Sequence, residues 1–546
     1  MSQAVAPLRI RQFRSLWIAS IFSNVGSFLQ AVAGAWLMLE LTGSATWVGL
    51  MAASTTLPLL FLALAAGAVA DLVNRGKVLL VSQIVMGLAA AGMATITHLD
   101  LVTPARLLGL SLLLGVGVAF NLPAWQAMVP DLVPRGMVAS AVALNSVAFN
   151  VARAVGPALG GLIVATAGPQ LAFSLNALSY LGVIAVLAVL TRRLGTADRD
   201  ASSVANAIAN GIRFARFTKP FRMLLLLASL FALTSAVIQT VLPNRTEELG
   251  GSADTFGLLL GAMGLGALVG AFTRQQVVES LGARSIPITI SLFGLAGIAT
   301  GLAPTPWWTV PGLLLAGMAW VWTLTTTNAT AQLMSPEWVR GRAMSLYSLA
   351  FVGILPLGSI LAGTLADLIG SGAAMVALSI GSVVLGLSAP RFGIPALADV
   401  ETPEFTDEEP PNAHIATEGG PVMMVNTWLI DGQDLDTFLQ VMNEVRLVRL
   451  RTGAYRWRLY RNASDPHRLS EVFLTISWEE HLAQHRRIDD ASAGLLRRAR
   501  EFDRDGGPIT RHLVAVDVED PGDWEPLLAA HAEYHSNDGS IPLSAE

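Results

Sequence analysis

Long apolar runs separated by short polar loops fill the first 390 residues of the chain. A helix needs about 20 apolar residues to cross the hydrocarbon core of a bilayer. We therefore predict an all-α membrane part with twelve spanning helices. The predicted spans are residues 16–39, 45–70, 78–97, 107–129, 137–166, 171–190, 223–244, 256–273, 285–304, 307–334, 343–366 and 371–389.

The predicted spans divide into two groups of six, because the longest loop, residues 191–222, separates the sixth from the seventh. Within this loop, residues 201–217 can form an amphipathic helix. The loops after spans four and ten also match, reading PDLVPRG at 130–136 and PEWVRG at 336–341. A duplicated six-helix unit places such a repeat at equivalent positions. The predicted bundles are residues 1–195 and 222–390, joined by a cytoplasmic loop at 196–221.

The distribution of Lys and Arg predicts the orientation, because cytoplasmic loops carry an excess of these residues. If the N-terminus is cytoplasmic, the outer loops contain only Arg106 and Arg245, and the other loop cations lie inside. Both termini are then cytoplasmic. The first apolar run is too long for a signal peptide and lacks a cleavage site, so we interpret it as a retained helix.

The composition changes after residue 390. Residues 391–420 are rich in Pro and acidic side chains, which indicates a linker. Strand patterns then occur at 422–430, 454–462, 469–477 and 510–516, and helix patterns at 435–451 and 478–502. This order predicts a small cytoplasmic α+β domain of the ferredoxin-like type at residues 421–520. Residues 521–546 are a predicted flexible tail.

The overall composition limits the chemistry that the chain can perform. Apolar residues make up 53% of it and charged residues only 14%, which is typical of a membrane protein. The absence of Cys excludes disulfides and thiolate chemistry. His481 and His485 are four residues apart on one predicted helix, but no third ligand follows in a metal-binding pattern. We expect no enzyme activity, no metal, no cofactor and no nucleic acid partner.

Arg153 is the only charged residue between Met137 and Thr166. Near the centre of a span it lies roughly 20 Å deep, where a cation is costly unless it faces protein or a water-filled cavity. Ser146, Asn150 and Pro157 share its helix face, which makes a polar stripe. We predict that this stripe lines a transport cavity. The alternative is a structural Arg held by carbonyls and Asn side chains between packed helices.

Weaker candidates for the cavity are polar residues in other spans, namely Asn24, Gln30, Asn121 and Asn328. Each can instead form a hydrogen bond between helices, which is the commoner use of such a residue. No acidic residue lies deep in any span. Glu40, at the outer end of span one, is the coupling candidate.

The loop between spans two and three contains Gly67, Asp71, Arg75 and Lys77. Asp71 can cap a neighbouring helix N-terminus or pair with Arg135, which follows Asp131 in the loop after span four. Such contacts predict a cytoplasmic gate that opens when the halves move. The alternative is interfacial charge that follows the positive-inside rule.

These motifs resemble those of a known family. The loop with Gly67, Asp71, Arg75 and Lys77 resembles the signature of the major facilitator superfamily, and residues 156–161, with Gly156, Pro157, Gly160 and Gly161, resemble the fifth-helix motif of its exporter branches. Residues 120–124, 143–153 and 340–347 are similar to the enterobactin-exporter-like efflux subfamily. The resemblance covers residues 8–390 and implies proton-coupled export in a prokaryotic cytoplasmic membrane. Residues 421–520 resemble antibiotic-biosynthesis-monooxygenase-type domains in outline, which implies homodimerisation.

The leading hypothesis is a secondary transporter that exports small amphipathic molecules, such as a siderophore, metabolite or drug, by alternating access. An uptake carrier has the same fold, and only the fifth-helix motif argues against it. A membrane-anchored sensor whose C-terminal domain performs the function is the second alternative.

Overall fold

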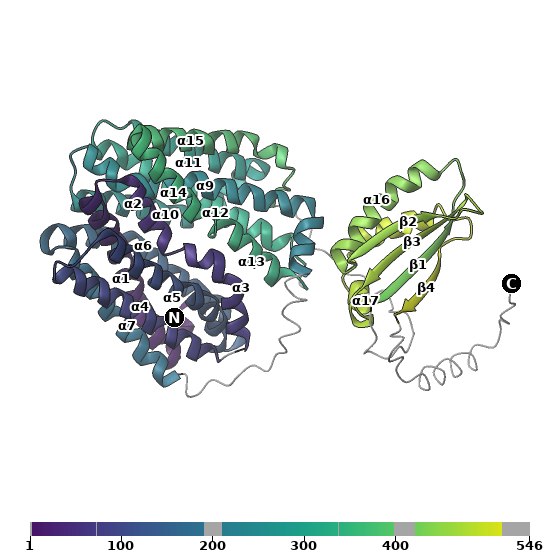
Figure 1. The fold of residues 1–546 in the computed structure, drawn as a ribbon, viewed down its shortest axis with the longest axis horizontal. Helices are drawn as coiled ribbons and strands as arrows, with labels where there is room; N and C mark the ends of the chain where they lie inside the picture. The colour runs from purple at the N-terminus through teal and green to yellow at the C-terminus, as the bar shows by residue number, and fades with distance from the viewer. Residues whose placement is uncertain (1–2, 73, 191–209, 337, 398–420, 516–546) are drawn as a thin grey trace. The chain divides into compact units, whose positions relative to one another are not determined.

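The computed structural model describes residues 3–72, 74–190, 210–336, 338–397 and 421–515 (Figure 1). Two compact units make up the chain. The first unit comprises Met1–Asn206, Met223–Met334 and Met344–Val400, and contains nearly all of the apolar helices. The second comprises Ala207–Arg222, Ser335–Ala343 and Glu401–Glu546. Each unit is described by itself.

The first half of the apolar unit is a bundle of helices (purple to blue in Figure 1). Its helices are η1 (Gln3–Arg9), α1 (Arg11–Thr42), α2 (Ala45–Ser54), α3 (Leu57–Leu72), α4 (Arg75–His98), α5 (Pro104–Asp131), η2 (Arg135–Met137), α6 (Val138–Ala167) and α7 (Pro169–Leu190). Helix α1 packs against α6 and α7, and α4 packs against α5 and α7.

The second half (teal to green in Figure 1) follows the same pattern. Its helices are α9 (Lys219–Glu248), α10 (Ala253–Leu281), η3 (Gly282–Arg284), α11 (Ser285–Leu302), η4 (Pro306–Thr309), α12 (Val310–Leu333), α13 (Arg340–Phe351), α14 (Leu355–Ile369), α15 (Ser371–Ser388) and η5 (Ala389–Phe392). Helix α12 packs against α10 and α11, and α11 packs against α15.

By length and composition, the described residues contain 10 helices that can cross a membrane. One of them, Ala253–Leu302, is 50 residues long and joins α10 to α11. At 1.5 Å per residue it would measure about 75 Å, more than twice the hydrocarbon thickness. The chain turns within it at Gly282, whose φ of 50° is in the left-handed region. The predicted span 45–70 is built from two shorter helices, α2 and α3.

Small residues allow the close packing of these helices. A Cβ built on Gly270 of α10 would lie 2.9 Å from the Cα atom of Met318 on α12. A Cβ on Gly26 of α1 would lie 2.6 Å from the side-chain oxygen of Asn176 on α7. Lipid offers no hydrophobic drive for association between helices, so close backbone contact and interhelical hydrogen bonds take that role.

The C-terminal domain within the second unit contains a four-stranded antiparallel sheet in the order β2-β3-β1-β4. Its elements are β1 (Val422–Leu429), α16 (Leu435–Thr452), β2 (Arg456–Arg461), β3 (Arg468–Thr475), α17 (Trp478–His485), α18 (Asp490–Arg500) and β4 (Ile509–Val514). Alternate residues of β1 are buried, among them Met424 and Trp428, and the core continues through Phe438 of α16 and Leu496 of α18.

The predicted single helix at 478–502 is wrong, because two helices, α17 and α18, occupy this segment. The side chain of Ser477 caps α17 by accepting the Glu480 N–H at 3.2 Å. Asp489 caps α18 by accepting the Ser492 N–H at 2.8 Å. A second capping residue in mid-segment starts a new helix. The predicted amphipathic helix at 201–217 lies partly outside the described residues, and residues 210–217 are helical.

Candidate functional site

Arg153 extends from α6 in the first half toward α12 in the second. Its guanidinium carbon lies 6.0 Å from the centroid of the Trp320 ring, a cation–π contact between the halves. Trp320 belongs to an aromatic cluster in the second half: its ring centroid is 5.8 Å from that of Phe231, 5.9 Å from that of Phe293 and 5.5 Å from that of Phe351. Arg153 therefore faces the other half of the protein rather than lipid.

No acidic side chain in the described part of the chain forms an ion pair with Arg153. Among the described residues, no ion pair or hydrogen bond involves its guanidinium, although its side chain is half-buried. The alternative interpretation, a structural Arg, requires hydrogen bonds to carbonyls or Asn side chains, and the described residues provide none. A guanidinium has five N–H donors, so Arg153 retains the capacity to bind an anionic or hydrogen-bond-accepting group.

The predicted polar stripe becomes less accessible along α6. Ser146 is exposed, Asn150 and Arg153 are half-buried, and Pro157 is buried. Ser146 donates to the Val142 carbonyl at 3.0 Å, and Asn150 donates to the Ser146 carbonyl at 2.8 Å, so both bond within their own helix. The stripe is therefore exposed at the Ser146 end and buried at the Pro157 end.

Helix α10 closes this end of the stripe through direct backbone contact. A Cβ built on Gly161 would lie 2.5 Å from the Ala253 carbonyl oxygen and 2.7 Å from the Gly257 Cα. A Cβ on Gly257 would lie 2.6 Å from the Pro157 carbonyl oxygen. We call the α6–α10 contact, together with the α2–α14 contact described next, the inter-half seam. Only glycine allows such an approach.

Helices α2 and α14 form the other part of the inter-half seam. A Cβ on Gly49 of α2 would lie 2.5 Å from the Ser359 carbonyl oxygen of α14. Asp367, near the end of α14, accepts hydrogen bonds from the Ala45 N–H at 2.6 Å and the Thr46 N–H at 2.9 Å. It also accepts the hydroxyl of Ser44 at 2.6 Å. A carboxylate from one half thus caps the positive N-terminus of a helix in the other.

The fifth-helix motif packs on two sides. Gly156 and Gly160 face α1, where a Cβ would lie 2.6 Å from the Phe28 Cβ and 3.2 Å from the Leu29 Cα, respectively. Gly161 faces α10 instead. The motif therefore holds α6 against its own half and against the other half at the same level.

Glu40 lies beside the inter-half seam. Its carboxylate accepts the indole N–H of Trp36 at 2.6 Å. The Trp36 ring stacks on Phe256 of α10, with centroids 6.0 Å apart and planes inclined by 22°. Sequence reasoning selected Glu40 but missed Trp36, Phe256 and Asp367. Asp367 is a carboxylate next to the end of a span, which is the one signal that could have pointed to it.

The weaker cavity candidates have varied environments. Gln30 is buried and accepts the side-chain N–H of Asn176 on α7 at 2.6 Å. Asn121 accepts from Gln83 of α4 at 2.9 Å. Both pairs are interhelical, as the alternative interpretation expected. Asn328 accepts from Gln332 of its own helix at 2.8 Å, and Asn24 is half-buried.

Only part of the predicted cytoplasmic gate can be placed. Arg75 is half-buried and Lys77 exposed at the start of α4. Asn74 caps this helix by accepting the Lys77 N–H at 3.2 Å. The surroundings of Gly67 and the side chains of Asp71, Asp131 and Arg135 lie outside the described part of the chain, so the gate stays a prediction.

Comparison with known proteins identifies the family. A family model described as transmembrane secretion effector, one of the major facilitator models, matches residues 2–520 of the 546. The chain belongs to this family. It is therefore a multi-pass membrane transporter, and the match extends over the sheet of the C-terminal domain.

Several known transporters are similar to this member of the transmembrane secretion effector family. The multidrug efflux pump Tap of Mycolicibacterium fortuitum is 28% identical over 387 residues, 68% of this chain and 93% of that protein. The enterobactin exporter EntS of Salmonella choleraesuis is 27% identical over 382 residues, 69% and 90% of the two chains. The staphyloferrin A transporter of Staphylococcus aureus is 24% identical over 355 residues, 64% and 89%.

Solved transporters have the same fold. A bacterial homologue of the lysosomal transporter Spinster, in an inward-facing and unoccupied conformation, matches with a TM-score of 0.57 at 15% identity, covering 73% of this chain and 100% of that one. A D-xylose–proton symporter matches with a TM-score of 0.57 at 14% identity, covering 71% and 99%. The predicted resemblance to the major facilitator superfamily and its enterobactin-exporter-like branch is confirmed.

Proposed function

We propose that the chain is a secondary exporter of small amphipathic molecules in the cytoplasmic membrane. It has twelve spans in two six-helix halves, with both termini in the cytoplasm. The ten candidate spans agree with this count once α10 and α11 are separated and α2 and α3 are taken as one interrupted span. Tap and EntS are named as exporters, which supports this direction of transport.

The observation that carries the proposal is the position of Arg153. An unpaired guanidinium in the middle of a membrane span is tolerated where water or a ligand reaches it. Arg153 contacts Trp320 of the opposite half, and Ser146 and Asn150 continue its face into an exposed region. A substrate with an anionic or acceptor group and a flat apolar body suits this pair, because Arg153 binds the first and the Trp320 cluster the second.

The inter-half seam supports alternating access. In the predicted orientation, α1 ends and α2 begins at the outer surface, so Ala45, Asp367 and Gly161 lie on the outer side of Arg153. The halves touch there, whereas the stripe becomes more exposed toward Ser146 on the cytoplasmic side. This arrangement is an inward-open state, and export requires the seam to separate while the cytoplasmic side closes.

Proton antiport is the proposed energy source, with Glu40 as the coupling group. Its hydrogen bond to Trp36, which stacks on Phe256 of the other half, links its charge state to the seam. Protonation would weaken a charge-assisted bond and so favour separation of the two rings.

A substrate-accumulation screen tests the proposal in cells with and without the protein. We expect at least one amphipathic compound to accumulate less when the protein is present, and this difference to vanish with Arg153→Ala. Arg153→Lys keeps the charge but not the planar stacking group, so it should retain only part of the activity. Arg106→Ala, in a predicted outer loop, is the matched control and should export normally.

Two outcomes contradict parts of this proposal. Normal export by a well-expressed Arg153→Ala protein would contradict the proposal that Arg153 lines the substrate cavity. Export that is insensitive to collapse of the proton gradient would contradict proton antiport but not the proposal of export.

For the C-terminal domain we propose a ferredoxin-like fold that pairs two copies of the chain. The order β2-β3-β1-β4 in an antiparallel sheet agrees with that topology. The face of the sheet opposite to Trp428 presents Tyr460, Ile509 and Leu513, which are 54%, 57% and 46% exposed. Sheets commonly bury such a face against another sheet. Ile509→Asp with Leu513→Asp should convert a dimer to a monomer in size-exclusion chromatography with light scattering. An unchanged mass argues against the interface.

A further inference from the structure

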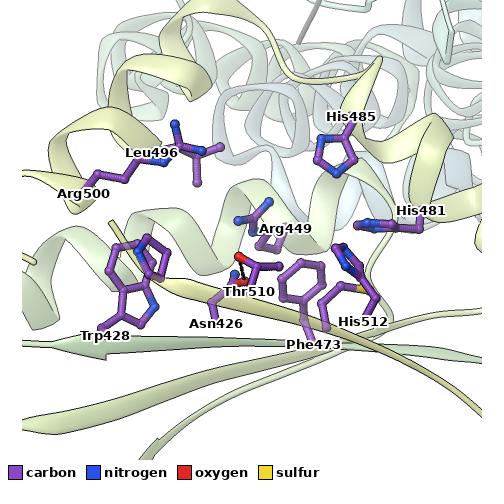
Figure 2. A pocket seen from close by; sticks show the side chains of 12 residues that line it. Asn426, Trp428, Arg449, Phe473, His481, His485, Leu496, Arg500, Thr510 and His512 are labelled. Carbon is purple, nitrogen blue, oxygen red and sulfur yellow. Dashed lines mark hydrogen bonds between the residues drawn. The ribbon is translucent and has the colours of Figure 1, made fainter. Parts of the chain in front are cut away.

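The C-terminal domain contains a cavity of about 370 Å³ between its sheet and its helices. Figure 2 shows Trp428 of β1 at one end, His481, His485 and His512 at the other, and Arg449 of α16 between them. A volume of this size is within the range that holds a small organic molecule. The proposed transport pathway uses none of these residues.

Two buried polar side chains of this cavity have no hydrogen-bond partner among the described residues. The indole nitrogen of Trp428 and both ring nitrogens of His481 are unpartnered, and each side chain is only 2% exposed. Buried polar groups are rarely left unpaired, because each costs about 1–3 kcal/mol. A ligand with hydrogen-bonding groups at both of its ends would satisfy them.

The charges around the cavity favour an anionic ligand. Arg449 and Arg500 line it, and none of its described lining residues is acidic. Glu471, which lies next to Arg449, is fully buried and already accepts hydrogen bonds from Arg449 at 3.3 Å, Trp457 at 2.9 Å and Asn426 at 2.7 Å. Arg500 is exposed at the end of α18, where it can attract an anion to the opening.

The apolar part of the lining is flat and aromatic. Phe473 of β3 forms a wall of the cavity, and the guanidinium carbon of Arg449 lies 4.6 Å from the centroid of its ring. The rings of His481 and His512 have centroids 5.0 Å apart, and those of His481 and His485 have centroids 4.8 Å apart. Planar surfaces at these positions suit a planar ligand, because ring faces pack in offset or edge-to-face contacts.

Burial gives His481 the charge state that such a ligand needs. Burial, followed by the nearby His485, His512 and Arg449, lowers the pKa of His481 to about 3. Its imidazole is therefore neutral and offers one donor and one acceptor. The three His do not form a metal site, since the described residues contain no group of three or more side chains placed to hold a metal.

We propose that this cavity is a binding site for a small aromatic carboxylate or phenolate. The aromatic ring lies against Phe473 and Trp428, the anionic group faces Arg449 and Arg500, and His481 donates or accepts a hydrogen bond at the other end. The site makes the C-terminal domain a ligand-binding module of the transporter. The proposal does not depend on export, because none of its residues belongs to the membrane unit.

The test is equilibrium binding of 3-fluoro-4-hydroxybenzoate, which has a carboxylate at one end and a hydroxyl at the other, to the purified full-length protein in detergent, followed by fluorine NMR. We expect saturable binding that 4-hydroxybenzoate displaces and 4-hydroxybenzyl alcohol, which is neutral, does not. Arg500→Gln should weaken binding about fivefold, because it removes a partly solvated charge. Arg498→Gln is the matched control, since Arg498 is also exposed on α18 but does not line the cavity, and its affinity should be unchanged.

A second variant tests the site by filling the cavity rather than by removing a charge. His512→Trp fills part of the cavity and should abolish displaceable binding, provided that its thermal unfolding matches that of the parent protein. Absence of saturable binding to the parent protein at millimolar probe overturns the proposal. Equal affinity of the parent, Arg500→Gln and folded His512→Trp proteins overturns it as well, because the probe then binds elsewhere.

Discussion

Replacement of Gly161 by Ala should open the inter-half seam. The added Cβ would lie 2.5 Å from the Ala253 carbonyl oxygen and 2.7 Å from the Gly257 Cα, and both atoms belong to the backbone of α10. Carbon and oxygen make ordinary contact at about 3.3 Å, so α6 and α10 must separate by roughly 0.8 Å. No side-chain rotation can relieve this overlap.

The magnitude follows from the cost of overpacking. One extra carbon in a rigid packed contact costs about 1–3 kcal/mol in the seam-closed state and nothing in a seam-open state. Each 1.4 kcal/mol changes a population ratio tenfold, so the open population should rise about tenfold, with an upper end near a hundredfold. Gly→Ala also favours a helix by about 0.5–1 kcal/mol, but that gain is the same in both states.

Cysteine labelling measures this change directly, because the chain contains no native Cys. Ala45 is 2% exposed, and its N–H is bonded to Asp367 within the seam. A thiol introduced as Ala45→Cys should react with a maleimide at a rate proportional to the open population. Measurement in detergent makes the result independent of the orientation in the membrane.

Gly109→Ala is the matched control, because a Cβ on Gly109 of α5 meets nothing within 4 Å. It adds the same carbon to a helix without filling a contact, so labelling of Ala45→Cys should stay at the parent rate. Equal labelling rates in the Gly161→Ala and Gly109→Ala backgrounds would refute the view that backbone contact at Gly161 holds the halves together.

Three further predictions follow from other contacts. Asp367→Ala removes the carboxylate that caps α2, so labelling of Ala45→Cys should rise severalfold, since a lost cap costs about 1 kcal/mol; an unchanged rate contradicts a holding role for Asp367. Gln30→Leu leaves the buried Asn176 amide without its acceptor, so it should lower the free energy of unfolding by about 1–3 kcal/mol. The set of exported compounds should not change. A changed export profile with unchanged thermal stability would instead place Gln30 in the cavity. Because the pKa of His481 is about 3 when folded and near 6.5 when unfolded, the unfolded domain binds more protons between these values. Its stability should therefore fall by about 1–2 kcal/mol from pH 7 to pH 5. Lower protection factors for amide hydrogen exchange in α17, after correction for the intrinsic exchange rate at each pH, would show this fall, and His481→Phe should reduce this dependence.

The sequence predicted a helical membrane protein because the bilayer imposes a length and a polarity on each span. Apolar runs gave the positions of the helices, and Arg153 was selected because a charge inside a span is rare and costly. The orientation of α6 followed from its period, which put Ser146, Asn150 and Arg153 on one face. The partner of Arg153, Trp320, could not be predicted, since sequence pattern does not specify which helices of two bundles meet.

The contacts of the inter-half seam were beyond sequence reasoning for a related reason. Gly161 and Gly257 are far apart in the chain, and glycine occurs throughout these helices. The neighbouring sequence does not distinguish a glycine that contacts the other half from a glycine such as Gly109, which faces open space. In the C-terminal domain, alternation of apolar and polar residues predicted the four strands, but the break between α17 and α18 was missed. Asp489 carried the signal, as an N-cap residue inside an apparently continuous helical pattern.

The composition of the inter-half seam has a kinetic consequence. Where Gly161 meets Gly257, the touching surfaces are peptide backbone, so parting them releases no side chains to reorder and rejoining them demands no choice of rotamer. Such a junction can be broken and remade many times with little entropy lost in each cycle. The fit between the two helices at this point depends only on the small size of glycine, and any larger side chain would hold the helices apart.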